Sequence, residues 1–186
     1  MRKLILSTNM SLDGYLAGPG GDLDWVIADD ELHDYYAAVL NRADAVLYGR
    51  VTYEIMANFW PTAPQDPSLS KSELEFAHAI NRIPKIVYSK TLQNVGWKTT
   101  LMRAVVPDEI LKMKQQPGND LLIAGADLAS TFIEHDLIDE YQLLVQPAVL
   151  GRGNPLFKDH RLALKLVSTQ PFHSGAVLLC YQPDRK

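Results

Sequence analysis

Short apolar runs alternate with helical spacings over the first two thirds of the chain. Runs of four to seven apolar residues that end at glycine or at charged residues are typical of buried strands. Segment 99–105 is ambiguous and is compatible with one further strand. The pattern otherwise predicts strands at residues 4–10, 45–48, 85–88 and 120–124.

The segments between these strands show apolar residues at a spacing near 3.6, as on one face of a helix. Asp29 or Asp30 is a suitable N-cap for the first helix, and Ser70 with Glu73 forms a capping-box pattern. Proline is accepted in the first turn of a helix and ends a helix that precedes it. Helices are therefore expected after residues 29–30, from Gly49 to before Pro61, from Ser70 to about Ile80, from Pro107 to about Gln115, and from Gly125 onward.

Only strands are predicted after about residue 138. The candidates are 140–145, 162–169 and 175–182, and residues 171–174 join the last two as a hairpin. Segments 18–22 and 151–155 are predicted to be loops. We therefore expect one α/β domain over residues 1–186, with three layers, a mainly parallel central sheet, helices on both faces and a C-terminal antiparallel hairpin.

Composition excludes several classes of function. The chain has 186 residues, 47% of them hydrophobic, and a net charge of −4. It has no Lys/Arg cluster and no apolar run near the ~20 residues of a membrane span, so neither nucleic acid nor membrane is an expected partner. Cys180 is the single cysteine, which excludes an intrachain disulfide and favours a cytoplasmic location. The five histidines lack metal-ligand spacing, so no metal site is expected.

Three predicted strand ends carry groups that suit phosphate. Strand 45–48 opens onto Gly49-Arg50-Val51-Thr52, strand 120–124 onto Gly125-Ala126-Asp127-Leu128, and strand 85–88 ends at Ser89-Lys90-Thr91. Free N–H groups at a helix N-terminus favour an anion, and an arginine adds a forked donor. Carboxyl ends of parallel strands share one rim of a sheet, where ligands bind. Three such groups on one rim fit a dinucleotide with an added 2′-phosphate, which is NADP.

Each of these signals also has an ordinary structural explanation. A small residue between strand and helix is common, Arg50 is suited to a surface ion pair, and Ser89-Lys90-Thr91 is compatible with a solvated turn. Thr52 is suited either to cap the helix or to contact the anion. The segment Gly18-Pro19-Gly20-Gly21 has Leu23 where a dinucleotide fingerprint has its third glycine, so it is predicted to be a flexible loop. Only the combination of the three strand ends favours NADP.

Taken in order, these pieces resemble the dihydrofolate reductase-like superfamily, most closely the branch related to the reductase (C-terminal) domain of the bacterial riboflavin biosynthesis deaminase-reductase. The resemblance covers nearly the whole chain. It is carried by segments 10–14, 47–54, 85–91, 121–128, 137–140 and 147–157.

The resemblance implies NADPH as the hydride donor. It assigns the pyrophosphate and the adenosine phosphate to Gly49, Arg50, Val51 and Thr52. It assigns the adenosine side to Ser89 and Lys90, and the central phosphates to Gly125, Ala126, Asp127 and Leu128. Backbone groups of Asn9 and Leu16 would meet the nicotinamide carboxamide.

The chain departs from the family pattern at two places. Ala124-Gly125 stands where the family often has Gly-Gly, and His33 occupies the position of the acid that holds the pterin in dihydrofolate reductase, with Asp30 and Asp34 nearby. The candidate proton sources are therefore His33, whose imidazole can donate a proton near neutral pH, Asp30, or a water. A half-exposed histidine without a role is the alternative.

Two functions follow from these residues. The first is an NADPH-dependent reductase of a small substrate, heteroaromatic or carbonyl-like, for which a pteridine- or pyrimidine-like ring is one option. The second is a non-catalytic nucleotide-binding or interaction module that retains the fold. A homodimer is expected with either function, through apolar residues of the strand-rich end: Leu143, Val145, Leu162, Leu164 and Leu166.

Overall fold

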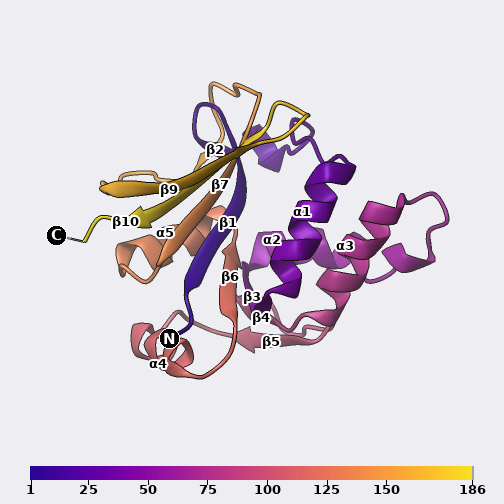
Figure 1. Cartoon of the computed structure of the whole chain (residues 1–186). Coiled ribbons are helices and arrows are strands. Elements are labelled where there is room, and N and C mark those ends of the chain that lie inside the picture. Colours follow the sequence, from indigo (N-terminus) through magenta and orange to yellow (C-terminus); the bar gives the residue numbers. More distant parts are fainter. Residues whose placement is uncertain (186) are drawn as a thin grey trace.

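The computed structural model describes residues 1–185, which form a central eight-stranded sheet with helices on both faces (Figure 1). The strand order is β5-β4-β3-β6-β1-β7-β10-β9. The strands are β1 (Leu4–Ser11), β3 (Ala43–Gly49), β4 (Lys85–Tyr88), β5 (Thr99–Met102), β6 (Asp120–Ala124), β7 (Glu140–Gln146), β9 (Leu164–Pro171) and β10 (Val177–Pro183).

Strands β5, β4, β3, β6, β1 and β7 are parallel to one another, as predicted. Strand β10 is antiparallel to both β7 and β9, so the last two strands form a hairpin at one edge of the sheet. Each strand of the hairpin begins two residues later than expected, and the ambiguous segment 99–105 contributes β5 over its first four residues.

The helices are α1 (Asp30–Asn41), α2 (Arg50–Phe59), α3 (Lys71–Arg82), α4 (Pro107–Gln115) and α5 (Ala126–Glu134), with short 3-10 turns η1 (Pro19–Gly21) and η2 (Ala63–Gln65). Side chains cap two of them as predicted. The Asp29 carboxylate accepts a hydrogen bond from the Leu32 amide at the start of α1. Ser70 and Glu73 form the reciprocal capping box of α3.

Alternate side chains along a strand point to opposite faces of the sheet, and different helices cover the two faces. This arrangement gives the three layers. On β3, Val46 and Tyr48 join the core beneath α1 and α3, together with Phe76 of α3. Leu47, between them in sequence, joins the core beneath α5, together with Phe132. This period of two is what an extended strand requires when both of its faces are covered.

A second, two-stranded sheet was not predicted. It pairs β2 (Tyr15–Ala17) with β8 (Asn154–Pro155), within the segment expected to be a loop. A Cβ on Gly153 would lie 2.1 Å from the Ala17 carbonyl oxygen, so this pairing requires glycine there. The prediction of a plain loop was wrong because the pairing depends on close backbone approach, which leaves no hydrophobic periodicity in the sequence.

The turn after β1 is joined to the same region by Asp13. Its carboxylate accepts hydrogen bonds from the amides of Leu150 (3.1 Å) and Gly151 (2.7 Å), and from the Ser11 hydroxyl at 2.7 Å. The Ser11 bond, followed by the two amides, holds the pKa of Asp13 below its ordinary value. Two segments that carry the family resemblance are thus fixed to each other beside the small sheet.

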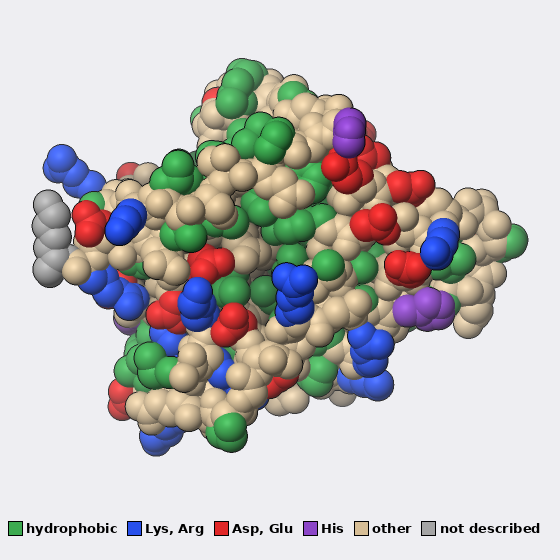
Figure 2. Space-filling model, viewed as in Figure 1, with side chains coloured by type: hydrophobic (Ala, Val, Ile, Leu, Met, Phe, Trp, Pro, Cys, Tyr) green, Lys and Arg blue, Asp and Glu red, His purple; other side chains and the backbone are tan. Residues whose placement is uncertain are grey.

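Acidic side chains gather over α1 and α3 on the face that Figure 2 shows. On α1, Asp30 and Asp34 are both exposed. The Asp30 carboxylate accepts a hydrogen bond from the Ser70 hydroxyl at 2.5 Å, which ties α1 to α3. Both carboxylates therefore belong to the outer surface of this helical layer.

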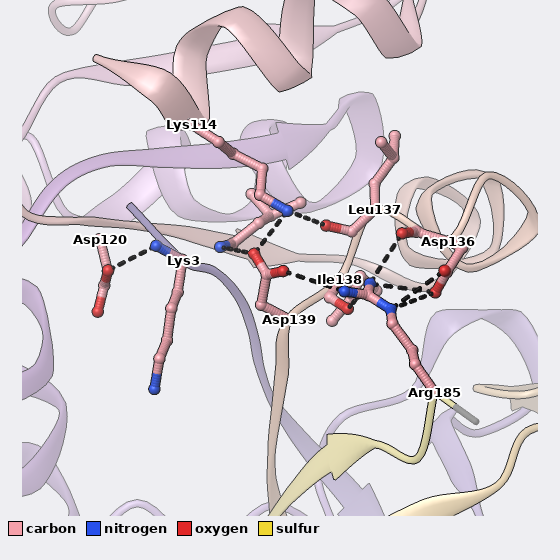
Figure 3. A network of polar contacts seen from close by, with 9 residues as sticks. Lys3, Lys114, Asp120, Asp136, Leu137, Ile138, Asp139 and Arg185 are labelled. Atoms are coloured by element: carbon pink, nitrogen blue, oxygen red, sulfur yellow. Dashed lines mark hydrogen bonds and ion pairs between the residues drawn. The ribbon is translucent and has the colours of Figure 1, made fainter. Parts of the chain in front are cut away.

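A network of ion pairs closes the amino end of the parallel strands (Figure 3). The buried Lys114 ammonium lies 2.7 Å from the Asp139 carboxylate and donates to the Leu137 carbonyl at 3.2 Å. Asp139 also accepts a hydrogen bond from the Leu4 amide and lies 3.7 Å from Arg185. These contacts link α4, the start of β1 and Arg185, two residues after the end of β10.

Lys85 at the start of β4 is the exception at this end. Its side chain is 1% exposed, and its ammonium nitrogen has no hydrogen-bond partner within residues 1–185. The nitrogen lies 3.9 Å from the centroid of the Trp97 ring, a cation–π contact. Burial, with a smaller contribution from Lys98, lowers the pKa of Lys85 to about 8.

The expected apolar surface of the strand-rich end is only partly present. Leu143 is 3% exposed and lies in the core, so its assignment to that surface was wrong. Strand β9 is exposed along most of its length, and it carries Leu166 and Val167 at 50% and 53% exposure. No helix within residues 1–185 is both long and apolar enough to span a membrane.

Candidate functional site

A cavity opens where β1 and β6 separate. The two strands pair only from Leu4↔Leu121 to Leu6↔Ile123, while β1 continues beside β7 as far as Ser11. Beyond Leu6, the edge of β1 that faces β6 has no strand partner and borders the cavity. The cavity has a volume of about 1470 Å³ and lies at the carboxyl ends of the parallel strands, the position expected for a ligand site in an open α/β sheet.

Every predicted site residue except Asp30 lines this cavity. Asp30 lies instead on the outer surface, bonded to Ser70. The residues that line the cavity are Asn9, Leu16, His33, Gly49, Arg50, Val51, Thr52, Ser89, Lys90, Gly125, Ala126, Asp127 and Leu128.

The N-termini of α2 and α5 both meet the cavity, and neither has a side-chain cap. Gly49 and Gly125 occupy the two N-cap positions, where α1 and α3 have Asp29 and Ser70. Because no side chain caps α2, the suggested capping role of Thr52 is not what the structure shows. The first amides of both helices are therefore available to an anion.

Gly49 is not required by the fold itself. Its φ of −74° and ψ of 164° suit any residue. A Cβ at this position would meet the Cβ of Leu128 at 3.6 Å, an ordinary van der Waals contact. The missing side chain instead leaves open space in front of the first turn of α2, which suits close approach of a ligand.

Gly125 is required by the backbone. Its φ is +106°, and a Cβ there would lie 2.6 Å from the Thr52 hydroxyl oxygen. The structure has no cis peptide bond within residues 1–185, so Ala124-Gly125 is trans. This conformation brings the start of α5 against the start of α2 and places the two N-termini side by side.

Basic side chains line the same part of the cavity. The Arg50 guanidinium lies 2.7 Å from Glu54 in a pair whose side chains are both 46% exposed, so a bound anion can compete for it. Lys90 is exposed, and no partner for its ammonium is found within residues 1–185. The predicted role of Arg50 as a surface ion-pair partner and its predicted role as a ligand are therefore compatible.

Arg103 was not predicted, although it also lines the cavity. Its guanidinium donates to the carbonyls of Ser89 at 3.2 Å and Leu92 at 2.6 Å, so its position is fixed. The Ser89 hydroxyl is itself engaged, because it accepts from the amides of Thr91 and Leu92. Ser89 thus shapes the turn as well as lining the cavity. Arg103 lies beyond a short strand in an ambiguous segment, so the sequence held no signal for it.

The opposite wall of the cavity is aromatic and comes from α1, α3 and Trp60, the residue after α2. His33 is 7% exposed, so the expectation of a half-exposed side chain was wrong. Its ring lies 5.7 Å from Phe76 and 6.2 Å from Trp60, both of which also line the cavity. Trp60 and Phe76 fall within two of the helices expected from the sequence, and no further signal marked either of them as part of a cavity wall.

One nitrogen of His33 is assigned by its contact. Nδ1 lies 3.0 Å from the Asp29 carbonyl oxygen, which can only accept a hydrogen bond, so Nδ1 carries a proton. Nε2 has no hydrogen-bond partner within residues 1–185 and is not among the fully buried unpaired atoms. Nε2 is therefore the nitrogen left for a ligand in the cavity.

No metal site accompanies these residues. Among residues 1–185, no group of three or more His, Cys, Asp or Glu side chains is placed to hold a metal ion. Asp127, the acidic residue that lines the cavity, is paired with Lys158 at 2.9 Å and is largely exposed.

Comparison with known proteins identifies the family of the chain. The model of the RibD C-terminal domain matches residues 2–178. The chain is 35% identical over 183 residues to the uncharacterized protein YyaP of Bacillus subtilis (strain 168), covering 97% of this chain and 94% of that protein.

Solved structures agree with this assignment. A putative riboflavin biosynthesis protein from Shewanella sp. PV-4 superposes with a TM-score of 0.75 at 25% identity, over 100% of both chains. A dihydrofolate reductase from Enterococcus faecalis, complexed with NADP(H), shares the fold, with a TM-score of 0.65 at 14% identity over 98% of this chain and 97% of that one. The family resemblance and the fold class predicted from the sequence are thereby confirmed. The chain belongs to the family of the RibD C-terminal domain.

Proposed function

We propose that this protein is an NADPH-dependent reductase that transfers hydride to a small, flat substrate, with a pteridine- or pyrimidine-like ring as the leading class. The observation that carries the proposal is the meeting of two uncapped helix N-termini, at Gly49 and Gly125, in one cavity at the carboxyl end of the sheet. Membership of the RibD C-terminal domain family, together with the fold shared with a dihydrofolate reductase, supports a reductase-type function.

The residues present fit the cofactor. The free amides of α2 and α5 suit the pyrophosphate, and Gly49 leaves the space that a phosphate needs to approach them. Arg50, Lys90 and Arg103 supply positive charge on the same side of the cavity, which suits the additional 2′-phosphate of NADPH.

The rest of the cavity would position the substrate and exclude water. When bound, NADPH supplies the hydride. The open edge of β1 from Ser7 to Asn9 offers backbone groups to a nicotinamide carboxamide, together with Leu16 of β2. The rings of Trp60 and Phe76 offer a flat apolar wall to the substrate, and Nε2 of His33 is the nitrogen placed to give it a proton.

A fluorescence titration of the purified protein with NADPH tests the proposal. Saturable binding at micromolar NADPH, at least about tenfold tighter than binding of NADH, is expected because the basic side chains favour the 2′-phosphate. Absence of saturable binding up to millimolar NADPH contradicts it.

A non-catalytic nucleotide-binding module is the second candidate. One observation favours it. The Asp30 carboxylate faces Ser70 on the outer surface, so of the two side chains predicted to supply a proton, only His33 lines the cavity. NADPH oxidation with any member of a broad substrate panel rules out this candidate. NADPH binding without turnover, in the wild type and in His33→Gln alike, supports it.

We also propose that two copies associate through β9. This strand is the edge of the sheet, and its exposed Leu166 and Val167 add apolar surface to unpaired backbone groups. Light scattering at micromolar concentration is expected to give the mass of a dimer, and the mass of a monomer contradicts the proposal.

A further inference from the structure

Two neighbouring side chains hold the Asn9 amide in one orientation. Its Oδ1 accepts a hydrogen bond from the Tyr36 hydroxyl at 2.8 Å and another from Nε2 of Gln146 at 2.8 Å. Asn9 and Ile5 lie on the same face of β1, and Tyr36 reaches this face from α1. The contact therefore lies beneath α1, the helix that contributes His33 to the aromatic wall.

The orientation follows from one backbone carbonyl. Nε2 of Gln146 also lies 3.2 Å from the Ile27 carbonyl oxygen, which can only accept. Turning the Gln146 amide over would place two acceptors against each other, so its nitrogen must face Ile27 and Asn9. The Asn9 atom that faces Gln146 is then necessarily the oxygen.

The surroundings of Gln146 and of the partly buried Tyr36 agree with this assignment. Gln146 is fully buried, and its Oε1 stays without a partner within residues 1–185. Burial raises the pKa of Tyr36 above its ordinary value, so its hydroxyl keeps the proton that it donates to Asn9. The Gln146 amide thus fixes the Asn9 amide, and the Tyr36 hydroxyl donates to the same Asn9 oxygen.

The consequence is a free donor in the cavity. Nδ2 of Asn9 makes no hydrogen bond within residues 1–185, and it is not among the fully buried unpaired atoms. Asn9 lines the cavity, so its two N–H groups face the open space there.

The surroundings indicate what these N–H groups meet. His33, Trp60 and Phe76 form the aromatic wall on the same side of the sheet, which suits a flat ring. The acidic residue that lines the cavity is Asp127, at the far side near α5, so this wall offers no carboxylate to an amino or amidinium group.

We infer that Asn9 is a specificity-determining residue that donates a hydrogen bond to a carbonyl oxygen on the substrate ring. The inference rests on the proposed reductase function. A substrate with an amino group at that position would meet donor against donor, and buried polar groups left unpaired in this way discriminate strongly between ligands.

Two probes of one shape test the inference: pyrimidin-4-one, which has a carbonyl acceptor, and 4-aminopyrimidine, which has an amine in its place. Their binding to the NADPH-saturated protein is measured by ligand-observed NMR up to 10 mM. The wild type is expected to bind pyrimidin-4-one about tenfold more tightly. Asn9→Asp keeps an acceptor for Tyr36 and Gln146 but replaces the N–H donors with an oxygen, so the preference should reverse.

Two further variants keep the test decisive. Asn94→Asp makes the same chemical change at an exposed loop position and should behave as the wild type. Asn9→Ala removes the donor and should bind both probes equally, which checks the inference if Asn9→Asp does not fold.

The role of Asn9 is overturned if the wild type shows no preference between the probes or binds neither of them. It is also overturned if the preference is unchanged in Asn9→Asp, or in Asn9→Ala where Asn9→Asp does not fold. A tenfold weaker NADPH affinity of Asn9→Asp with an unchanged preference also overturns it, because Nδ2 would then serve the cofactor. NADPH titrations of the same samples separate the two proposals. Binding of NADPH without a probe preference overturns only the role of Asn9, whereas no NADPH binding by the wild type overturns the reductase function.

Discussion

The two ends of the parallel sheet use charge differently. At the amino end, Lys114 and Asp139 are mostly buried and bonded to each other, and Arg185 completes the network (Figure 3). At the carboxyl end, Arg50 is half exposed beside Glu54, and Lys90 extends into open space at the cavity.

This difference separates stability from binding. A buried ion pair is costly to break, because the remaining charge is left without compensation. An exposed basic group contributes little to folding and is free to meet an anion. Substitutions at the amino end should therefore change the free energy of unfolding, and substitutions at the carboxyl end should change NADPH affinity.

The largest effect is expected from Lys114→Ala. It leaves the Asp139 carboxylate without its nearest cation, so the free energy of unfolding should fall by about 3 kcal/mol. Urea denaturation measures the change. The NADPH dissociation constant of the folded fraction should stay within about twofold of the wild type.

Lys71→Ala is the matched control, because it removes an ion pair whose lysine is 90% exposed. No measurable loss of stability is expected from it. Equal losses in the two variants would show that burial of the Lys114 pair has no special role.

The next effect is expected from Gly49→Ala. The fold accepts a Cβ there, so the melting temperature should stay close to that of the wild type. The added methyl group fills the space in front of the amides of α2, so NADPH binding should weaken by about thirtyfold.

Gly151→Ala serves as its control, since a Cβ at Gly151 meets nothing within 4 Å and the residue does not line the cavity. Its φ of +70° predicts some loss of stability with unchanged NADPH affinity. An unchanged affinity of Gly49→Ala would remove the main support for a phosphate at α2.

Lys85→Met is expected to stabilise the protein at neutral pH. The pKa of Lys85 falls to about 8 in the folded state, below its unfolded value of 10.5, so the folded state binds fewer protons between these values. The wild type therefore gains stability as the pH rises from 8 to 10.5, and the cost of the buried charge is complete below pH 8.

At pH 7 the variant should be more stable by at most about 3 kcal/mol, the free energy that corresponds to a pKa lowered from 10.5 to about 8, and the difference should vanish near pH 10.5. Denaturation of both proteins over this pH range measures it. A variant that is less stable at pH 7 would show that the contact between Lys85 and Trp97 outweighs the cost of burial.

The smallest effect is expected from Lys90→Gln. NADPH binding should weaken by about fivefold and NADH binding should not change, because the lysine is exposed and acts on the 2′-phosphate through charge. The effect should shrink at 0.5 M salt. Lys112→Gln, which removes the same charge from the exposed side of α4, should leave both affinities unchanged.

The carboxyl end could be predicted from the sequence because its signals are local. A strand that passes directly into a helix at Gly49 or Gly125 can be recognised within a few residues, and the carboxyl ends of parallel strands meet at one rim. The sheet, its helices and the C-terminal hairpin followed from the same periodicities, with errors mainly at the ends of β9 and β10.

The aromatic wall and the amino end could not be predicted, because their partners lie far apart in the chain. The rings of Trp60, just after α2, and Phe76 of α3 lie 4.5 Å apart between centroids, and Gln146 reaches Asn9 across 137 positions. Asp30 was predicted to be near the reaction because it is close to His33 in sequence, but successive helical positions point in different directions. No local pattern marks which face of α1 turns toward a ligand.

A backbone NMR titration with NADPH tests the division between the two ends most directly. The largest amide shifts should appear at residues 49–52 and 125–128, while the amides of Lys114 and Asp139 should move little. Shifts concentrated at the amino end, or no saturable shifts at millimolar NADPH, would contradict a cofactor site at the carboxyl end of the sheet.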